Sequence, residues 1–166
     1  MSKKISIAID AMGGDNSPDK TIQGIKIFLD KNRTKNDFII NLFGKEKIIL
    51  DKLKDYKISS DTINVINSET VISDEETPLT AVKSSRGTSM WDCIKHQLDG
   101  KSDISLSAGN TGVLLVISRM ILKMMNEVSK PALAGLWPSK KGMTVVLDLG
   151  ANIECDEKNL VDFSEM

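Results

Sequence analysis

Histidine and cysteine, which supply many catalytic and metal sites, are scarce in this sequence. The chain has one histidine and 2 cysteines, and Cys93 and Cys155 lie far apart and outside any CxxC pattern. This scarcity argues against a disulfide framework and a zinc site, so a reducing cytoplasm is the simplest setting. A Ser-His-Asp triad would have to use His96. That residue falls opposite the apolar side of the predicted helix 89–98, so we expect it to be exposed.

An excess of one charge and long apolar runs are missing as well. The 22 basic and 23 acidic residues nearly cancel, so there is no electrostatic footprint of a nucleic-acid-binding protein. The longest apolar run, Val113–Ile117, is too short to span a bilayer. The first ten residues lack the apolar core of a signal peptide. Neither GxGxxG nor GxxxxGK[ST] occurs, which argues against a dinucleotide fingerprint and a P-loop.

The sequence does contain a repeated order of short apolar strand, glycine-containing loop and helix. Ser17 and Pro18 fit an N-cap followed by the first position of a helix. The apolar spacing predicts strands at 5–9, 38–43, 62–66, 104–106, 132–136 and 144–149. It predicts helices at 18–31, 45–56, 89–98 and 113–125. Two further helices are expected, one near Pro78 and one that begins at Asp156. This alternation favours an α/β fold with a largely parallel sheet. The 166 residues suit a single domain, or half of a larger one.

Three polar, glycine-containing loops follow predicted strands. They read DAMGGDNSP at 10–18, SAGNTG at 107–112 and DLGAN at 148–152. Loops at the carboxyl ends of parallel strands share one edge of the sheet, where open α/β sheets bind ligands. Glycine lets the backbone approach a ligand, and helix N-termini offer N–H groups to anions. We expect an anion site here; the alternative for each loop is a tight turn and nothing more.

Other features have simpler explanations. Cys93 lies on the apolar side of its helix and is expected to be a core residue. The helix 113–125 is apolar nearly all round, so it is either buried on both sides or part of a dimer interface. The lysines near 45–57 form a solvated face or a surface for an acidic partner.

These observations predict an anion cradle with few side chains that could act as a base or nucleophile. Such a site suits a reaction whose substrate is itself the nucleophile, and inorganic phosphate is one example. Phosphate needs binding and orientation more than activation. If it attacked an acyl carbonyl, backbone N–H groups of the loops could stabilise the oxyanion.

The order and spacing of several segments resemble the bacterial phosphate acyltransferases of the PlsX family. The segments are IAIDAMGGDNSP, TPLTAVKSSRGTSM, SAGNTG, KPALAGLWPS and VVLDLGANIECDEKNLVDF. DAMGGD, SAGNTG and DxGAN together are far more specific than any one of them alone. The resemblance extends over the whole chain, but family members are about twice as long, so it implies that the C-terminal half is absent.

The resemblance implies a Rossmann-like, three-layer α/β/α fold with a mostly parallel sheet. It implies an acyltransferase that converts acyl-[acyl carrier protein] and inorganic phosphate into acyl phosphate and free acyl carrier protein, for phospholipid synthesis. It further implies a cytoplasmic homodimer with no metal or organic cofactor and no nucleic-acid partner. Peripheral contact is implied with the membrane, where glycerol-3-phosphate acyltransferase uses the acyl phosphate.

The family's motifs carry over to particular residues as expected phosphate- or substrate-binding positions. These are Asp10, Gly13, Gly14, Asp15, Lys83, Arg86, Ser107, Gly109, Asn110, Thr111, Gly112, Asp148, Gly150 and Asn152. Lys83 and Arg86 are candidates for the phosphate or the carrier's phosphopantetheine, or are simply exposed helix charges. No catalytic residue is assigned.

The chain departs from the family pattern at some positions. Asn16 stands where histidine is common, and Trp137-Pro138-Ser139 replaces Leu-Pro-Thr. The helix from Asp156 has no closing glycine. One alternative is therefore a non-catalytic remnant that binds a ligand or partner without turnover. A second is a nucleotide-binding oxidoreductase on a similar sheet, against which the missing fingerprint counts.

Overall fold

The computed structural model describes residues 4–32, 37–59, 61–73 and 76–166. By their contacts these residues form two compact units, Met1–Ile117 and Ser118–Met166. Both candidate loops at 10–18 and 107–112 belong to the first unit. The loop at 148–152 belongs to the second.

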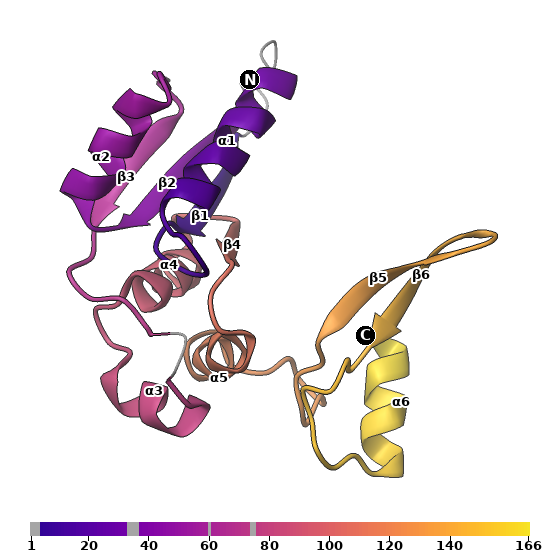
Figure 1. The fold of residues 1–166 in the computed structure, drawn as a ribbon. Coiled ribbons are helices and arrows are strands. Elements are labelled where there is room, and N and C mark those ends of the chain that lie inside the picture. The colour runs from indigo at the N-terminus through magenta and orange to yellow at the C-terminus, as the bar shows by residue number, and fades with distance from the viewer. Residues whose placement is uncertain (1–3, 33–36, 60, 74–75) are drawn as a thin grey trace. The chain divides into compact units, whose positions relative to one another are not determined.

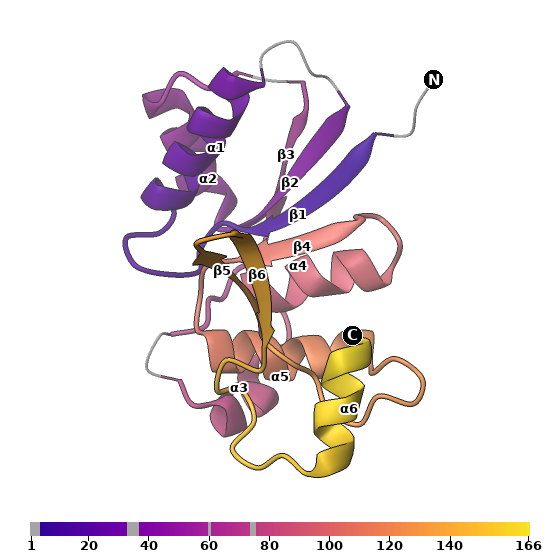
Figure 2. The same ribbon diagram turned by 90° about the vertical axis from the view of Figure 1, so that its right-hand side faces the viewer.

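A four-stranded parallel sheet is the centre of the first unit. Its order is β3-β2-β1-β4, with β1 at Ile5–Asp10, β2 at Phe38–Gly44, β3 at Ile63–Asn67 and β4 at Ile104–Ser107. Every pair is parallel, and the register aligns Asp10 of β1 with Phe43 of β2 and with Ser107 of β4. The strands therefore end together at one edge (Figure 2), as the sequence predicts.

Helices cover both faces of this sheet. Helices α1 (Asp19–Lys31) and α2 (Glu46–Asp55) lie on one face, and α4 (Ser89–Leu98) lies on the other (Figure 1). Short α3 (Pro78–Ser84) precedes α4, and α5 (Thr111–Leu122) follows β4. The three-layer α/β arrangement with a parallel sheet confirms the predicted fold class.

Period-two alternation along the strands explains the two-sided core. Ile9 and Leu42 face α1 and α2, where they pack with the buried Ile22 and Ile49. The next residues along the strands, such as Ala8, point to the other face and pack in a second cluster with Phe43 and Cys93. Cys93 is a buried core residue, as predicted.

The start of α1 differs from the prediction. The helix begins at Asp19, with Pro18 in the cap position, and no side chain caps it. Ser17 instead donates its hydroxyl to the backbone oxygen of Gly13. The serine therefore closes the loop rather than capping the helix.

Helix α5 is most deeply buried along one stripe. Val113 and Ile117 are fully buried and Ile121 nearly so, whereas Met120 and Leu122 are each 37% exposed. Positions i, i+4 and i+8 form this stripe. Leu114, Leu115 and Val116 are half-buried, so burial extends around the first part of the helix, whereas Arg119, Met120 and Leu122 are exposed. None of the helices in the described ranges combines the length and apolar character that crossing a membrane requires.

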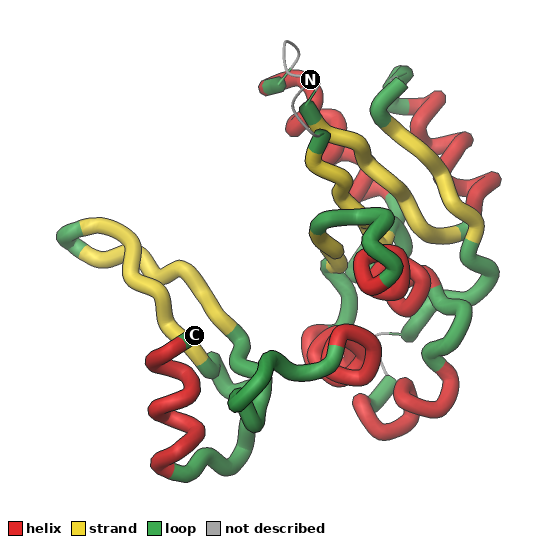
Figure 3. The backbone as a smooth tube through the Cα atoms, turned by 180° about the vertical axis from the view of Figure 1, so that it is seen from behind, coloured by secondary structure: helices red, strands yellow, loops and turns green. Residues whose placement is uncertain are grey.

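The second unit contains an antiparallel hairpin followed by a helix. Strands β5 (Ala134–Ser139) and β6 (Gly142–Leu147) pair with each other in a separate two-stranded sheet, seen as a pair of yellow strands in Figure 3, and α6 spans Glu157–Glu165. Asp156 caps α6, as predicted, by accepting a hydrogen bond from Asn159.

The hairpin corrects the expectation that these two strands belong to the parallel sheet. Only Lys140 and Lys141 separate β5 from β6. A parallel connection needs a crossover of roughly a dozen residues or more, so this short connection forces antiparallel pairing.

Candidate anion-binding site

The ends of two neighbouring strands are joined by a partly buried hydrogen bond. Asp10 is the last residue of β1 and is 2% exposed. Its Oδ2 accepts a hydrogen bond of 2.8 Å from the Ser107 hydroxyl at the end of β4, and its Oδ1 accepts one of 3.2 Å from the N–H of Met12. The Ser107 hydroxyl in turn accepts from the N–H of Gly109 at 3.1 Å. The two loops therefore share one small polar network.

Glycines allow the two loops to touch. A Cβ on Gly13 would lie 2.6 Å from Asp10 Oδ2 and 2.8 Å from the Gly109 nitrogen. A Cβ on Gly14, which has a φ of +88°, would lie 2.5 Å from the Ala108 oxygen. Contacts this short cannot be accommodated without movement of the backbone. The structure thus brings together the first two candidate loops, as the sequence predicts.

The second loop ends at the N-terminus of α5. Asn110 Oδ1 accepts a hydrogen bond of 3.1 Å from the N–H of Val113, while Asn110 Nδ2 donates to the Glu76 carbonyl at 3.2 Å. The N–H groups of Thr111 and Gly112 lie in the first turn, where they have no intrahelical acceptor. Such groups, at the positive end of the helix dipole, favour anions.

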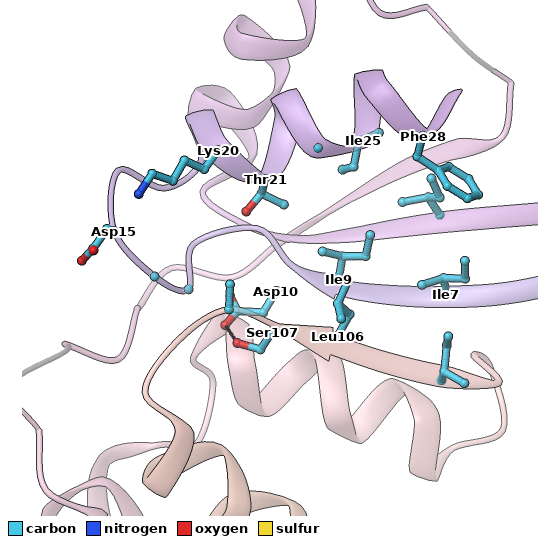
Figure 4. A pocket seen from close by; sticks show the side chains of 16 residues that line it. Ile7, Ile9, Asp10, Asp15, Lys20, Thr21, Ile25, Phe28, Leu106 and Ser107 are labelled. Atoms are coloured by element: carbon cyan, nitrogen blue, oxygen red, sulfur yellow. Dashed lines mark hydrogen bonds between the residues drawn. The ribbon is translucent and has the colours of Figure 1, made fainter. Parts of the chain in front are cut away.

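A cavity of about 650 Å³ opens beside the first loop, between α1 and strands β1 and β4. Figure 4 shows its polar residues at one end and its apolar residues toward the other. Five of the expected site residues line it: Asp10, Gly13, Gly14, Asp15 and Ser107.

Lys20 and Thr21 also line the cavity, and they are absent from the sequence-based set of site residues. They occupy the first turn of α1, directly after the glycine loop. Lys20 is exposed and brings a positive charge to the polar end of the cavity. The signal in the sequence was a lysine two positions after Pro18, in the helix turn that the loop enters.

The structure places Lys83 and Arg86 outside this cavity. Both are exposed. Lys83 is in the last turn of α3, and the Arg86 guanidinium lies 5.8 Å from the centre of the Trp91 ring. Their proposed roles toward phosphate or phosphopantetheine remain predictions.

The third candidate loop follows β6 of the separate hairpin and not a strand of the parallel sheet. This corrects the expectation that each of the three loops follows a strand of one parallel sheet. Within its own unit the loop is held by its own side chains. Asp148 Oδ1 accepts from the backbone N–H and side-chain amide of Asn152 at 3.2 and 3.0 Å, and Gly150 donates its N–H to the Asp148 carbonyl. Binding roles for Asp148, Gly150 and Asn152 stay predictions.

His96 is half-buried rather than exposed, which corrects the sequence-based expectation. Its Nδ1 lies 2.8 Å from the Ser102 hydroxyl and its ring packs edge-on against Phe43. Burial, with a smaller effect of Lys101, lowers the pKa of His96. Burial raises the pKa of the Cys93 thiol to about 12, so this sulfur stays protonated and is no nucleophile. Neither side chain lines the cavity.

Residues 5–166 match the family model described as "Fatty acid synthesis protein". The chain belongs to this fatty acid synthesis protein family. Among the described residues, no three His, Cys, Asp or Glu side chains are grouped so that they could hold a metal ion.

Curated relatives of this fatty acid synthesis protein carry the name phosphate acyltransferase. The relative from Pelagibacter ubique (strain HTCC1062) is 49% identical over 166 residues, which cover 100% of this chain and 48% of the relative. The relative from Ehrlichia ruminantium (strain Gardel) is 38% identical over 162 residues, or 98% of this chain and 48% of the relative. The relative from Maricaulis maris (strain MCS10) is 35% identical over 161 residues, which cover 97% of this chain and 46% of the relative. The chain thus spans about half the length of the curated relatives it matches.

Proposed function

We propose that this chain binds inorganic phosphate and transfers to it the acyl group of acyl-[acyl carrier protein], giving acyl phosphate and free carrier protein. The observation that carries the proposal is the pair of glycine loops, fastened by the Asp10–Ser107 hydrogen bond, beside the polar end of the cavity. The names of the relatives support the acyltransferase class.

The chemistry fits the side chains that are near. A phosphate oxygen forms a bond to the thioester carbonyl carbon, and the resulting tetrahedral oxyanion is stabilised by backbone N–H donors. Collapse of this intermediate breaks the carbon–sulfur bond and releases a thiolate, which later takes a proton from solvent. A thiol has a pKa of about 8.5 and leaves without an acid catalyst. The site therefore needs to orient the substrates and stabilise the oxyanion, and it does not need a histidine as an acid catalyst.

The same proposal includes the protein's partners and setting. The enzyme would act as a cytoplasmic homodimer, with peripheral contact to the membrane acyltransferase that consumes acyl phosphate in phospholipid synthesis. A second candidate is binding without turnover, which is favoured by one observation: the residues that line the cavity include no histidine and no cysteine.

Phosphate binding can be tested with two lysines of the same helix. Lys20 lines the cavity, whereas Lys31 is an exposed lysine in the last turn of α1. We expect Lys20→Gln to weaken the affinity for inorganic phosphate about fivefold, the loss of one exposed charge-assisted contact. Lys31→Gln should leave it unchanged. Calorimetric titration with phosphate measures both, and equal effects of the two variants would contradict the site.

Turnover needs a separate assay. The chain is mixed with acyl-[acyl carrier protein] and phosphate, and acyl phosphate is trapped with hydroxylamine as the hydroxamate. The full-length Pelagibacter relative is the positive control. Hydroxamate formed by this chain supports the enzyme. Phosphate binding without hydroxamate supports the non-catalytic alternative, and loss of both rejects the proposal.

A further inference from the structure

Much of the cavity is too apolar to be explained by phosphate. Beyond its polar end it is lined by Ile7 and Ile9 of β1, Ile25 and Phe28 of α1, and Leu106 of β4. Its volume of about 650 Å³ lies within the range of roughly 300–1,000 Å³ that small-molecule sites occupy. An inorganic phosphate ion would fill only a small part of it.

The apolar lining is open rather than packed. Phe28 is 39% exposed, Ile104 49% and Leu106 57%, and all three line the cavity. The described residues cover these side chains only in part, with Phe28 packed edge-on against Phe38. Burying apolar surface is favourable, so a ligand that covered the rest would gain free energy. Figure 4 shows Phe28, Ile7 and Leu106 away from the polar end, where Asp10 and Ser107 lie. The cavity therefore has a polar end, where Asp10, Asp15, Lys20 and Ser107 lie, and an apolar end that is continuous with it.

Gly24 leaves room in the middle of this space. It lines the cavity from α1, and a Cβ added to it would meet no atom within 4 Å. The cavity-lining residues of α1 are Lys20, Thr21, Gly24, Ile25 and Phe28, and the last four recur at the spacing of one helix face. The distance along the helix from Thr21 to Phe28 is about 10 Å at 1.5 Å per residue. A side chain at Gly24 would project into the cavity midway between them.

We propose that the apolar part of the cavity binds the hydrocarbon chain of the acyl substrate, and that Gly24 and Phe28 set the chain length it accepts. The reacting carbonyl group then lies at the Asp10–Ser107 end, next to the phosphate. Gly24 provides space along the chain, and Phe28 marks the far end of the α1 wall. This inference rests on the proposed function, because it assigns a place to the acyl group of that reaction.

Alkyl phosphates test the inference without turnover. Their head group is a phosphate ester, and their tails can be lengthened stepwise from butyl to dodecyl, below the concentration at which micelles form. Each buried methylene should raise the affinity about fourfold over inorganic phosphate. We expect this rise to level off at a tail length that the cavity sets.

Two variants should move that limit in opposite directions. Gly24→Leu fills the middle of the cavity and should shift the limit to shorter tails. Phe28→Ala removes the ring at the far end and should shift it to longer ones. Ile27→Ala is the matched control, because Ile27 is 57% exposed on the same helix and is not part of the lining. Opposite shifts cannot both arise from partial unfolding.

The outcomes separate the two proposals. A length limit that moves with Gly24→Leu and Phe28→Ala, but not with Ile27→Ala, supports the acyl site. Binding of inorganic phosphate with no gain from any alkyl tail overturns the acyl site but leaves the proposed function standing. Tail-length dependence that is the same in all variants also overturns the roles of Gly24 and Phe28. If neither phosphate nor alkyl phosphates bind, both proposals fail.

Discussion

Adding a single methyl group at Gly13 should disrupt the network that joins the two loops. In Gly13→Ala the new Cβ would sit 2.6 Å from Asp10 Oδ2 and 2.8 Å from both the Ser107 hydroxyl and the Gly109 nitrogen. Asp10 is 2% exposed, and its carboxylate accepts hydrogen bonds from Ser107 and Met12, so moving it to make room costs these bonds. The methyl group must therefore displace Asp10 from Ser107, or push the two loops apart.

The expected loss of stability follows from these contacts. A hydrogen bond to a charged group contributes about 1.5–3 kcal/mol, and overpacking costs about 1–3 kcal/mol. Alanine restricts the unfolded chain more than glycine, which returns about 0.4–1 kcal/mol. Because the first two effects overlap, we expect Gly13→Ala to lower the free energy of unfolding by about 2–4 kcal/mol.

Urea denaturation followed by circular dichroism measures this loss, and Gly24→Ala is the matched control. That substitution adds the same methyl group inside α1, where nothing lies within 4 Å. Better helix propensity should raise the free energy of unfolding by about 0.5–1 kcal/mol. The same substitution should thus lower the free energy of unfolding at Gly13 and raise it at Gly24. If Gly13→Ala proved as stable as the unsubstituted chain, the close approach of the loops would be wrong.

Three further predictions concern other parts of the chain. Burial lowers the pKa of His96 from 6.5, so the unfolded state binds more protons than the folded state just below that pH. The melting temperature should therefore fall as the pH drops below about 6.5. His96→Gln should make the melting temperature less dependent on pH in this range. Iodoacetamide should label the exposed Cys155 in the native protein, and Cys93, whose pKa is raised to about 12, only after denaturation, as read by mass spectrometry. Asp156→Ala removes the hydrogen bond that caps α6 and should lower the free energy of unfolding by about 1 kcal/mol, whereas an unchanged value would show that the cap is dispensable.

The parallel sheet and its loop edge could be predicted because local patterns determine them. Isoleucines at alternate positions of 5–9 predict a strand with one apolar face, and a Gly-rich loop follows it directly. Parallel strands separated by helices must end at the same edge. This rule alone brings the loops at 10–18 and 107–112 together.

The remaining details depend on contacts between distant residues. The register that sets Ser107 opposite Asp10 is a property of the whole sheet, so their hydrogen bond has no local signal. His96 looked exposed because helix periodicity describes one helix alone, while Phe43 and Ser102 come from other elements. The hairpin did have a signal, the short Ser139–Gly142 connection, but the predicted strand bounds hid it. Lys20 joins the site only because α1 packs beside the cavity.

Ser107 donates to one loop's anchoring carboxylate and accepts from the other loop's backbone, so the two turns cannot shift independently. A ligand that draws Gly109 toward it would loosen the hydroxyl's hold on Asp10 and so re-aim the turn that follows β1. A movement of either loop would therefore change the geometry of both hydrogen bonds at this one oxygen atom. Ser107→Ala removes that oxygen atom, so the loops at 10–18 and 107–112 would lose this connection while every glycine stays in place.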